Sequence, residues 1–340
     1  MMMPGCLIFH DRRPLALNGI GNDDRRLVLG IFCFYKCLLQ SSNIISIGNI
    51  YDMPAETCET VMQVFMTHDI FRITGDLQVI TVDDCTKIVQ MILVCRHKGY
   101  GLKTLQVYEN TDDLTQVVEE LRICGCVGII LLGTELSAGI CRRFLEASLP
   151  MVLLDASFDA IDCSSVLINN VQGTYLATGY LIDRCNEQPG HLCSSYSIAN
   201  FSERKTGFQK AVREHGMSVS KSLSHELAPS IEGAFSDMLE IIDSGTPLAK
   251  CYFADNDLIA IGAIKALKLR GYKIPDDIAI IGFDNISEGR ILDPSLTTID
   301  IPRRFMGQTA VDQLIRQMED PASHTVKLQI STSLIKRFSV

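Results

Sequence analysis

The sequence lacks every cysteine pattern that would hold a metal ion. Its 13 cysteines include no Cys-x-x-Cys pair, and the closest pairs are Cys33 with Cys37 and Cys124 with Cys126. Neither pair has a histidine nearby at the spacing of a zinc site. Unpaired thiols dispersed over apolar segments are typical of a reducing compartment, where free cysteine packs as a small hydrophobic residue. We therefore expect a cytoplasmic protein with no metal and no cofactor.

A long apolar run and a credible export signal are also missing. The one segment that resembles an export signal, Leu27–Leu39, is shorter than the roughly 20 apolar residues that span a bilayer, and it contains Lys36. It begins far from the N-terminus, and no small-x-small cleavage site follows it. We expect this segment to be a buried first helix and the protein to have no membrane partner.

Basic residues are too few for a protein that coats nucleic acid. The chain has 31 Lys and Arg against 40 Asp and Glu, which gives a formal net charge of -9. The field of the whole molecule therefore repels phosphate, so any contact with nucleic acid must come from a local feature. Hydrophobic residues make up 47% of the 340 positions, an ordinary globular composition that predicts two or three folded units.

Motifs of catalysis are absent as well. The sequence contains no Gly-x-Ser-x-Gly, no Walker loop and no His-Glu-x-x-His, and its seven histidines are scattered. The acidic pairs Asp83-Asp84 and Asp112-Asp113 each precede an expected helix, where acidic residues favour the helix dipole. We do not expect an enzyme.

From residue 77 onward, short apolar runs alternate with helical periodicities, a pattern typical of βαβ units. The expected strands are 77–82, 104–109, 127–132, 151–155, 165–169, 251–255 and 278–284. The expected helices are 84–98, 114–123, 137–147, 173–184, 202–214, 231–243, 258–270 and 306–318, several of which stop at a glycine. The sequence thus predicts an α/β fold with two lobes of doubly wound parallel sheet and a ligand cleft between them.

One stretch carries a family resemblance. Residues 251–301 read CYFADNDLIAIGAIKALKLRGYKIPDDIAIIGFDNISEGRILDPSLTTIDI. The ordered Asn-Asp, Gly-Ala, Pro-Asp-Asp, Gly-Phe-Asp and Pro-x-Leu-Thr-Thr motifs resemble the C-terminal lobe of the lactose and galactose repressor family (LacI/GalR). The segments GIILLGTELS, VLLDASFDAID, NNVQGTYLATGYLI and ERKTGFQKAVREHGM continue the resemblance, which covers about 77–340. It implies a periplasmic-binding-protein-like body that closes on a small molecule, usually a sugar, a sugar phosphate or a nucleobase.

The resemblance also implies a set of ligand-binding residues. Position by position, Arg204 is the effector arginine, Asn256 is the cleft asparagine, and Asp284 is the acidic residue after Gly-Phe. Gln172 stands where the family often has Asp or Glu, and Phe201 is a candidate for stacking on a ring face. Arg, Asp and Asn at strand ends suit polyol recognition, because their planar groups match adjacent hydroxyls. The alternative is that Asn256 and Asp284 only cap loops, as Asx residues often do.

The pattern of strands and helices and the family resemblance together predict the domain boundaries. We divide the chain into an N-terminal arm (1–24), a unit that resembles a winged helix-turn-helix (25–76) and an effector-binding domain (77–340). We expect the first lobe to hold about 77–168 and 298–322. We expect the second lobe to hold about 169–297 and 323–340.

The predicted winged unit carries the expected DNA contacts. They are Thr57, Thr60, Gln63 and Arg72. Between residues 41 and 82, Arg72 is the only Arg or Lys against Asp52, Glu56, Glu59, Asp69 and Asp76. That acidic balance does not suit phosphate contacts, so most of the case for DNA binding comes from the family resemblance.

The leading hypothesis is a ligand-responsive, DNA-binding transcriptional regulator with a sugar-like effector and operator DNA as partners. We expect a homodimer, because two reading heads on a two-fold axis match a palindromic operator. An alternative is a sugar sensor or binding module whose degenerate N-terminal unit contacts protein instead of DNA. A third reading, an exported solute-binding protein, is disfavoured by the missing signal peptide.

Overall fold

The computed structural model describes the backbone of residues 5–11, 97–106 and 126–340. Between these ranges it also describes residues 87, 90, 91, 93–95, 117, 118, 121 and 123. The predicted winged unit (25–76), its DNA contacts Thr57, Thr60, Gln63 and Arg72, and the expected strand 77–82 lie outside the described residues.

The first lobe is built on a six-stranded sheet with the order β11-β5-β4-β3-β1-β2. Its strands are β1 (Gly5–Asp11), β2 (Tyr100–Gln106), β3 (Cys126–Leu132), β4 (Met151–Leu154), β5 (Ser164–Ile168) and β11 (Lys327–Ile330). Strands β3, β4, β5 and β11 are parallel, whereas β1 runs antiparallel to both of its neighbours. Helix α11 (Arg303–Glu319) packs on one face and α5 (Ala138–Leu145) on the other.

The second lobe is built on a four-stranded parallel sheet with the order β7-β6-β8-β9. Its strands are β6 (Gly190–Ser194), β7 (Ser224–Leu227), β8 (Cys251–Ala254) and β9 (Ala279–Ile281). Helices α6 (Asn170–Cys185) and α7 (Ala199–Glu214) cover one face, and α8 (Ile231–Asp243) and α9 (Asp257–Leu269) cover the other. All residues of β8 are buried, as expected for a parallel strand covered on both faces. The short helices η2 (Val219–Lys221) and α10 (Ser287–Ile291) complete this lobe.

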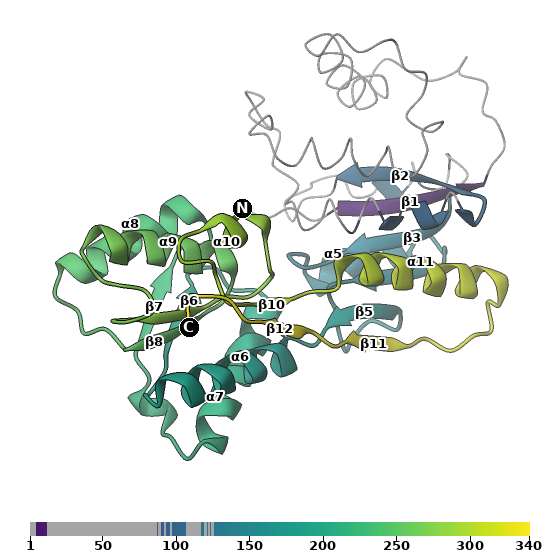
Figure 1. The fold of residues 1–340 in the computed structure, drawn as a ribbon. Helices are drawn as coiled ribbons and strands as arrows, with labels where there is room; N and C mark the ends of the chain where they lie inside the picture. The colour runs from purple at the N-terminus through teal and green to yellow at the C-terminus, as the bar shows by residue number, and fades with distance from the viewer. Residues whose placement is uncertain are drawn as a thin grey trace, which may run out of the picture.

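A small sheet lies between the two lobes. Strand β10 (Thr298–Asp300) pairs antiparallel with β12 (Ser333–Ile335), and Figure 1 shows this pair between the two larger sheets. The chain passes between the lobes here, because α11 follows β10 and β12 follows β11. These connecting segments are therefore the hinge about which the lobes can move relative to one another.

The predicted α/β architecture of two lobes with mainly parallel sheets is confirmed, and every predicted helix from 137 onward is present. Two expectations about the ends of the chain were wrong. Residues 5–11, assigned to an N-terminal arm, form β1 inside the first sheet. Residues 327–330, assigned to the second lobe, pair with β5 in the first lobe. Both strands pair with segments far away in the chain, β1 with β2 and β3 and β11 with β5, so no local sequence signal indicated their partners.

Helix ends follow the sequence signals. Four helices begin at a side chain that accepts a backbone N–H in the first turn. These caps are Ser137 for α5, Asn169 for α6, Ser230 for α8 and Asn256 for α9. Gly216, Gly245 and Gly271, which were predicted to stop helices, have φ angles of 73°, 73° and 88°. Only glycine adopts this left-handed backbone without strain, which explains why these helices end where they do.

Candidate ligand-binding site

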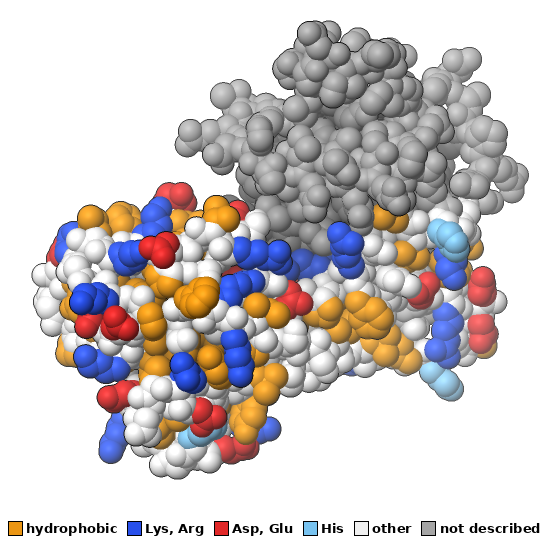
Figure 2. Space-filling model, viewed as in Figure 1, with side chains coloured by type: hydrophobic (Ala, Val, Ile, Leu, Met, Phe, Trp, Pro, Cys, Tyr) orange, Lys and Arg blue, Asp and Glu red, His pale blue; other side chains and the backbone are white. Residues whose placement is uncertain are grey.

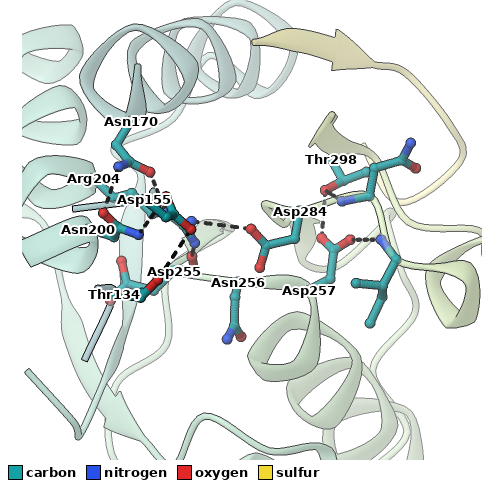
Figure 3. Close-up of polar contacts among 12 residues, drawn as sticks. Thr134, Asp155, Asn170, Asn200, Arg204, Asp255, Asn256, Asp257, Asp284 and Thr298 are labelled. Atoms are coloured by element: carbon teal, nitrogen blue, oxygen red, sulfur yellow. Dashed lines mark hydrogen bonds and ion pairs between the residues drawn. The ribbon is translucent and has the colours of Figure 1, made fainter. Parts of the chain in front are cut away.

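Arg204 on α7 is the centre of the polar cluster between the lobes. Its Nη2 lies 3.2 Å from Asp284 Oδ1, and its Nε donates to Asn170 Oδ1 over 3.0 Å. Its Nη1 donates to the backbone carbonyl of Asp255. The guanidinium stacks on the ring of Phe283, with Cζ 3.8 Å from the ring centroid. Three hydrogen-bond acceptors and one aromatic ring thus hold the guanidinium, and Arg204 is only 4% exposed. Figure 3 shows the polar contacts.

Two other residues that the sequence predicted to bind the ligand lie next to Arg204. Asp284 pairs with it directly, and the Phe201 ring centroid lies 5.5 Å from its Cζ. Asp284 comes after β9, at the carboxyl end of the second sheet, where α/β folds place ligand contacts. The fold therefore brings Asp284 to Arg204 and Phe201, which lie one turn apart on α7.

Asn256 and Gln172 have other contacts. Asn256 Oδ1 accepts from Ile259 N over 2.9 Å as the cap of α9, and its side chain points away from the Arg204–Asp284 pair (Figure 3). Its buried Nδ2 has no hydrogen-bond partner within the described part of the chain. Gln172 bonds Thr332 through three hydrogen bonds, with Thr332 Oγ1 at 2.9 Å from its Oε1. Gln172 therefore ties α6 to the hinge between β11 and β12.

The first lobe contributes a carboxylate that sequence analysis did not assign. Asp155 follows β4, and its Oδ2 accepts from Lys87 Nζ at 2.8 Å and from Thr134 Oγ1 at 3.4 Å. Its Oδ1 accepts from Asn200 Nδ2 of α7 at 3.4 Å. Asn200 Oδ1 in turn accepts from Asn170 Nδ2 at 3.2 Å, and Asn170 is the partner of Arg204. A continuous hydrogen-bonded network thus crosses from the first lobe to Arg204 in the second.

The charge of Asp155 is maintained in spite of its burial. Burial alone raises the pKa of this carboxyl, but the charge and hydrogen bond of Lys87, the charge of Arg204 and the hydrogen bond of Asn200 together lower the pKa below its ordinary value. Asp155 is therefore ionised at neutral pH, and it offers a carboxylate to the space between the lobes.

Both carboxylates occupy an unusual backbone conformation. The φ angle is 62° at Asp155 and 111° at Asp284, in a region that residues other than glycine rarely adopt. Such conformations persist where surrounding contacts hold them, and they are enriched at ligand sites. An aspartate after a buried parallel strand is a signal that these two residues share, and it would have identified Asp155 from the sequence.

A second set of contacts positions the loop that carries Asp284. Asp257 Oδ1 accepts from Thr298 Oγ1 at 2.6 Å, and its Oδ2 accepts from Ile286 N at 2.9 Å. A Cβ atom at Gly282 would lie 2.1 Å from Asp257 Oδ1. The glycine of the Gly-Phe-Asp motif is thus required because the Asp257 carboxylate fills the space beside its backbone.

We expect Gly282→Ala to destabilise the protein by about 2 kcal/mol, the usual cost of inserting a methyl group into a filled space. The clash displaces Asp257 and with it the Asp284 loop, so ligand affinity should fall together with the melting temperature. Thermal unfolding followed by circular dichroism measures the first effect. Gly139→Ala is the matched control, because its Cβ would meet only Ser137 Oγ at 3.7 Å. Equal melting temperatures for the two variants would contradict this account of Gly282.

The described residues hold no group of three or more His, Cys, Asp or Glu side chains that could bind a metal ion. In the same part of the chain, no helix combines the length and apolar character needed to cross a bilayer.

Comparison with known proteins places the fold. A model of the periplasmic-binding-protein-like domain matches residues 179–340. The HTH-type transcriptional repressor PurR of Pasteurella multocida is 29% identical over 249 residues, which cover 72% of this chain and 74% of the repressor. The cellobiose complex of the transcriptional regulator CelR superposes with a TM-score of 0.69 at 20% identity, over 76% of this chain and 79% of CelR. A LacI family regulator from Enterococcus faecium with bound ribose has a TM-score of 0.67 at 23% identity, over 76% of this chain and 94% of that one.

The two-lobed body resembles the effector domains of LacI-family regulators. In this body, Asp155, Asp255 and Asp284 follow the carboxyl ends of β4, β8 and β9 and face α7, the helix that carries Arg204. The resemblance inferred from the motifs after residue 251 is confirmed.

Proposed function

We propose that this protein is a cytoplasmic, ligand-responsive transcriptional regulator that binds a sugar or sugar-like molecule between its lobes and thereby alters its affinity for operator DNA. Its body is of the LacI/GalR type, and the relatives that match most of its length are transcriptional repressors. These relatives are regulators, which supports a function in binding and not in catalysis.

The observation that carries the proposal is the buried Arg204 network. A guanidinium and two carboxylates, Asp155 from the first lobe and Asp284 from the second, are connected through Asn170 and Asn200 with little exposure to solvent. In this structure the buried groups satisfy one another, and a polyol can take over their contacts because adjacent hydroxyls both donate and accept. A ligand between the lobes would replace several of these contacts and so couple its binding to closure of the hinge.

The class of ligand is supported by the structural relatives. One of them is a complex with cellobiose and another a complex with ribose. We assign Arg204, Asp284 and Phe201 to the ligand, with Asp155 and Asn200 added from the structure. Asn256 and Gln172 remain predictions of the family pattern, since their present contacts stabilise α9 and the hinge.

Operator binding is assigned to the N-terminal unit, with Thr57, Thr60, Gln63 and Arg72 as its expected contacts. Figure 2 shows basic and acidic side chains interspersed over the visible face of the second lobe. An interspersed surface does not provide the continuous basic area that phosphate contacts favour. We propose a homodimer, since the repressor architecture places two such units on a two-fold axis.

The decisive experiment measures how tightly the full chain binds each expected partner, the small molecule and the operator DNA. Calorimetric titration with ribose, cellobiose, ribose 5-phosphate and adenine identifies the ligand class. Fluorescence anisotropy with labelled DNA from the upstream region of the gene, and with scrambled DNA, then measures operator affinity with and without that ligand. We expect one sugar-like compound to bind and to change operator affinity by about 5- to 150-fold.

Two outcomes would contradict the proposal. No binding of any sugar would exclude the assigned effector class. If the folded protein binds a sugar but binds neither the upstream DNA nor the scrambled DNA at low salt, the alternative of a sensor module without operator binding is favoured.

A further inference from the structure

A cysteine, a histidine and an aspartate form a hydrogen-bonded chain at the carboxyl ends of β6 and β8. His191 Nε2 lies 2.7 Å from Asp255 Oδ1, and His191 Nδ1 lies 3.2 Å from Cys193 Sγ. Cys193 follows His191 by two positions on β6, so both side chains lie on the same face of the strand. The ligand-binding proposal does not use His191 or Cys193.

The histidine is fixed from three directions. Its ring stacks on Phe208 with centroids 5.0 Å apart, and it is almost fully buried. Asp255 is itself held, because its Oδ2 accepts from Ser194 N at 2.8 Å. The order is therefore a thiol, a base within hydrogen-bond reach of it, and a carboxylate that orients the base. This arrangement activates cysteine nucleophiles in proteins of many folds.

The electrostatics favour transfer of a proton to the histidine. Burial opposes the charged form of His191, but its hydrogen bonds to Asp255 and Cys193 outweigh burial and raise its pKa to about 9. His191 is therefore an imidazolium at pH 7, and its positive charge lies next to Cys193 Sγ.

Access separates Cys193 from most other described thiols. Cys95, Cys126, Cys141, Cys163 and Cys251 are buried, whereas Cys185 and Cys193 are partly exposed. Burial raises the pKa of Cys163 to about 11, which makes that thiol unreactive at neutral pH. Of the two partly exposed thiols, only Cys193 has a histidine contact in the described part of the chain.

We propose that Cys193 is a modification site, a nucleophilic thiol served by the His191–Asp255 pair that exchanges with low-molecular-weight disulfides. Cys193 releases its thiol proton to solvent, and Sγ, next to the His191 imidazolium, attacks one sulfur of the disulfide. A new S–S bond forms on Cys193 while the S–S bond of the reagent breaks, and the leaving thiolate takes up the proton. The products are a mixed disulfide and one free thiol, so no other oxidant is needed.

The site is connected to the candidate ligand site through one residue. The backbone carbonyl of Asp255 accepts a hydrogen bond from Arg204, and its carboxylate bonds His191. A mixed disulfide at Cys193 removes the thiol contact of His191 and adds bulk beside Asp255. We therefore expect modification to change the affinity for the effector.

Peptide-resolved mass spectrometry of the full, unliganded chain tests the proposal. The protein is incubated with oxidised glutathione at pH 7, quenched with acid and digested without reduction. We expect Cys193 to be glutathionylated at least about 10-fold faster than the buried Cys163 in the same digest. In His191→Gln, the rate at Cys193 should fall by at least about 10-fold, while the rate at Cys185 should not change.

Asp255→Asn keeps the size of the side chain and provides a second test if His191→Gln does not fold, which circular dichroism checks for both. A rate at Cys193 equal to that at Cys163, or an unchanged rate in either folded variant, would overturn the proposal. Because labelling is measured without effector or DNA, failure of sugar binding would not affect this result.

Discussion

Replacing Arg204 by lysine is expected to weaken sugar binding by about 30-fold or more. The guanidinium makes planar contacts with Asn170, Asp255 and Asp284 at the same time, and an ammonium group cannot reproduce this fork. Removing one partner of a buried, hydrogen-bonded charge pair costs about 2–5 kcal/mol. Each 1.4 kcal/mol corresponds to about a factor of ten in affinity, which gives the stated loss.

Arg213→Lys is the matched control on the same helix. Arg213 is exposed and donates only to Gln209 one turn away, at 3.2 Å, so its replacement should leave the affinity within about twofold. Calorimetric titration of both variants with the sugar that binds the parent protein makes the comparison. Equal affinity of Arg204→Lys and the parent protein, with unchanged melting temperature, would show that the ligand binds elsewhere.

Much of the fold was predictable because its strands are covered on both faces. Runs such as CVGIILL and CYFA are buried along almost their whole length, so each is a nearly continuous apolar segment that is visible in the sequence. The strands that prediction missed are different. β6 reads GHLCS and β7 reads SHEL, and their polar residues disguise the pattern. In β6 the His191 side chain is buried only because Asp255, 64 positions away, accepts its hydrogen bond.

The candidate site divides in the same way. Arg204 and Asp284 were assigned because each lies in a motif with a recognisable order, and Phe201 was assigned as an aromatic residue that could stack on a ring face. Asp155 was not assigned, although it has the same placement after a buried strand as Asp284. Its partner Lys87 is 68 positions away on a segment read as an ordinary helix, and no local signal links the two. Interactions between distant segments are thus the part of the site that only the structure shows.

Lys87→Met is expected to destabilise the protein by about 3–5 kcal/mol at neutral pH, the usual cost of leaving a buried charge without its partner. The Lys87 and Asp155 side chains are 5% and 7% exposed, so water does not replace the lost contact. In the parent protein, Lys87 lowers the pKa of Asp155 despite burial. The Asp155 carboxylate therefore stabilises the fold above the pKa that it has in the unfolded chain, and this stabilisation is lost as the pH falls through its pKa in the folded protein. Without Lys87, burial dominates and favours the protonated carboxyl.

The difference in stability between parent and Lys87→Met should therefore be largest near pH 7 and shrink as the pH falls below about 4, where Asp155 is protonated in the unfolded chain as well. Urea unfolding at a series of pH values measures it. Lys87→Met combined with Asp155→Asn should recover part of the loss, since no unpaired charge remains. Lys327→Met is the control, because its 3.3 Å pair with Asp159 is exposed and should contribute at most about 1 kcal/mol. A loss in Lys87→Met that does not vary with pH would mean that packing, and not the charge of Asp155, accounts for the stability that Lys87 provides.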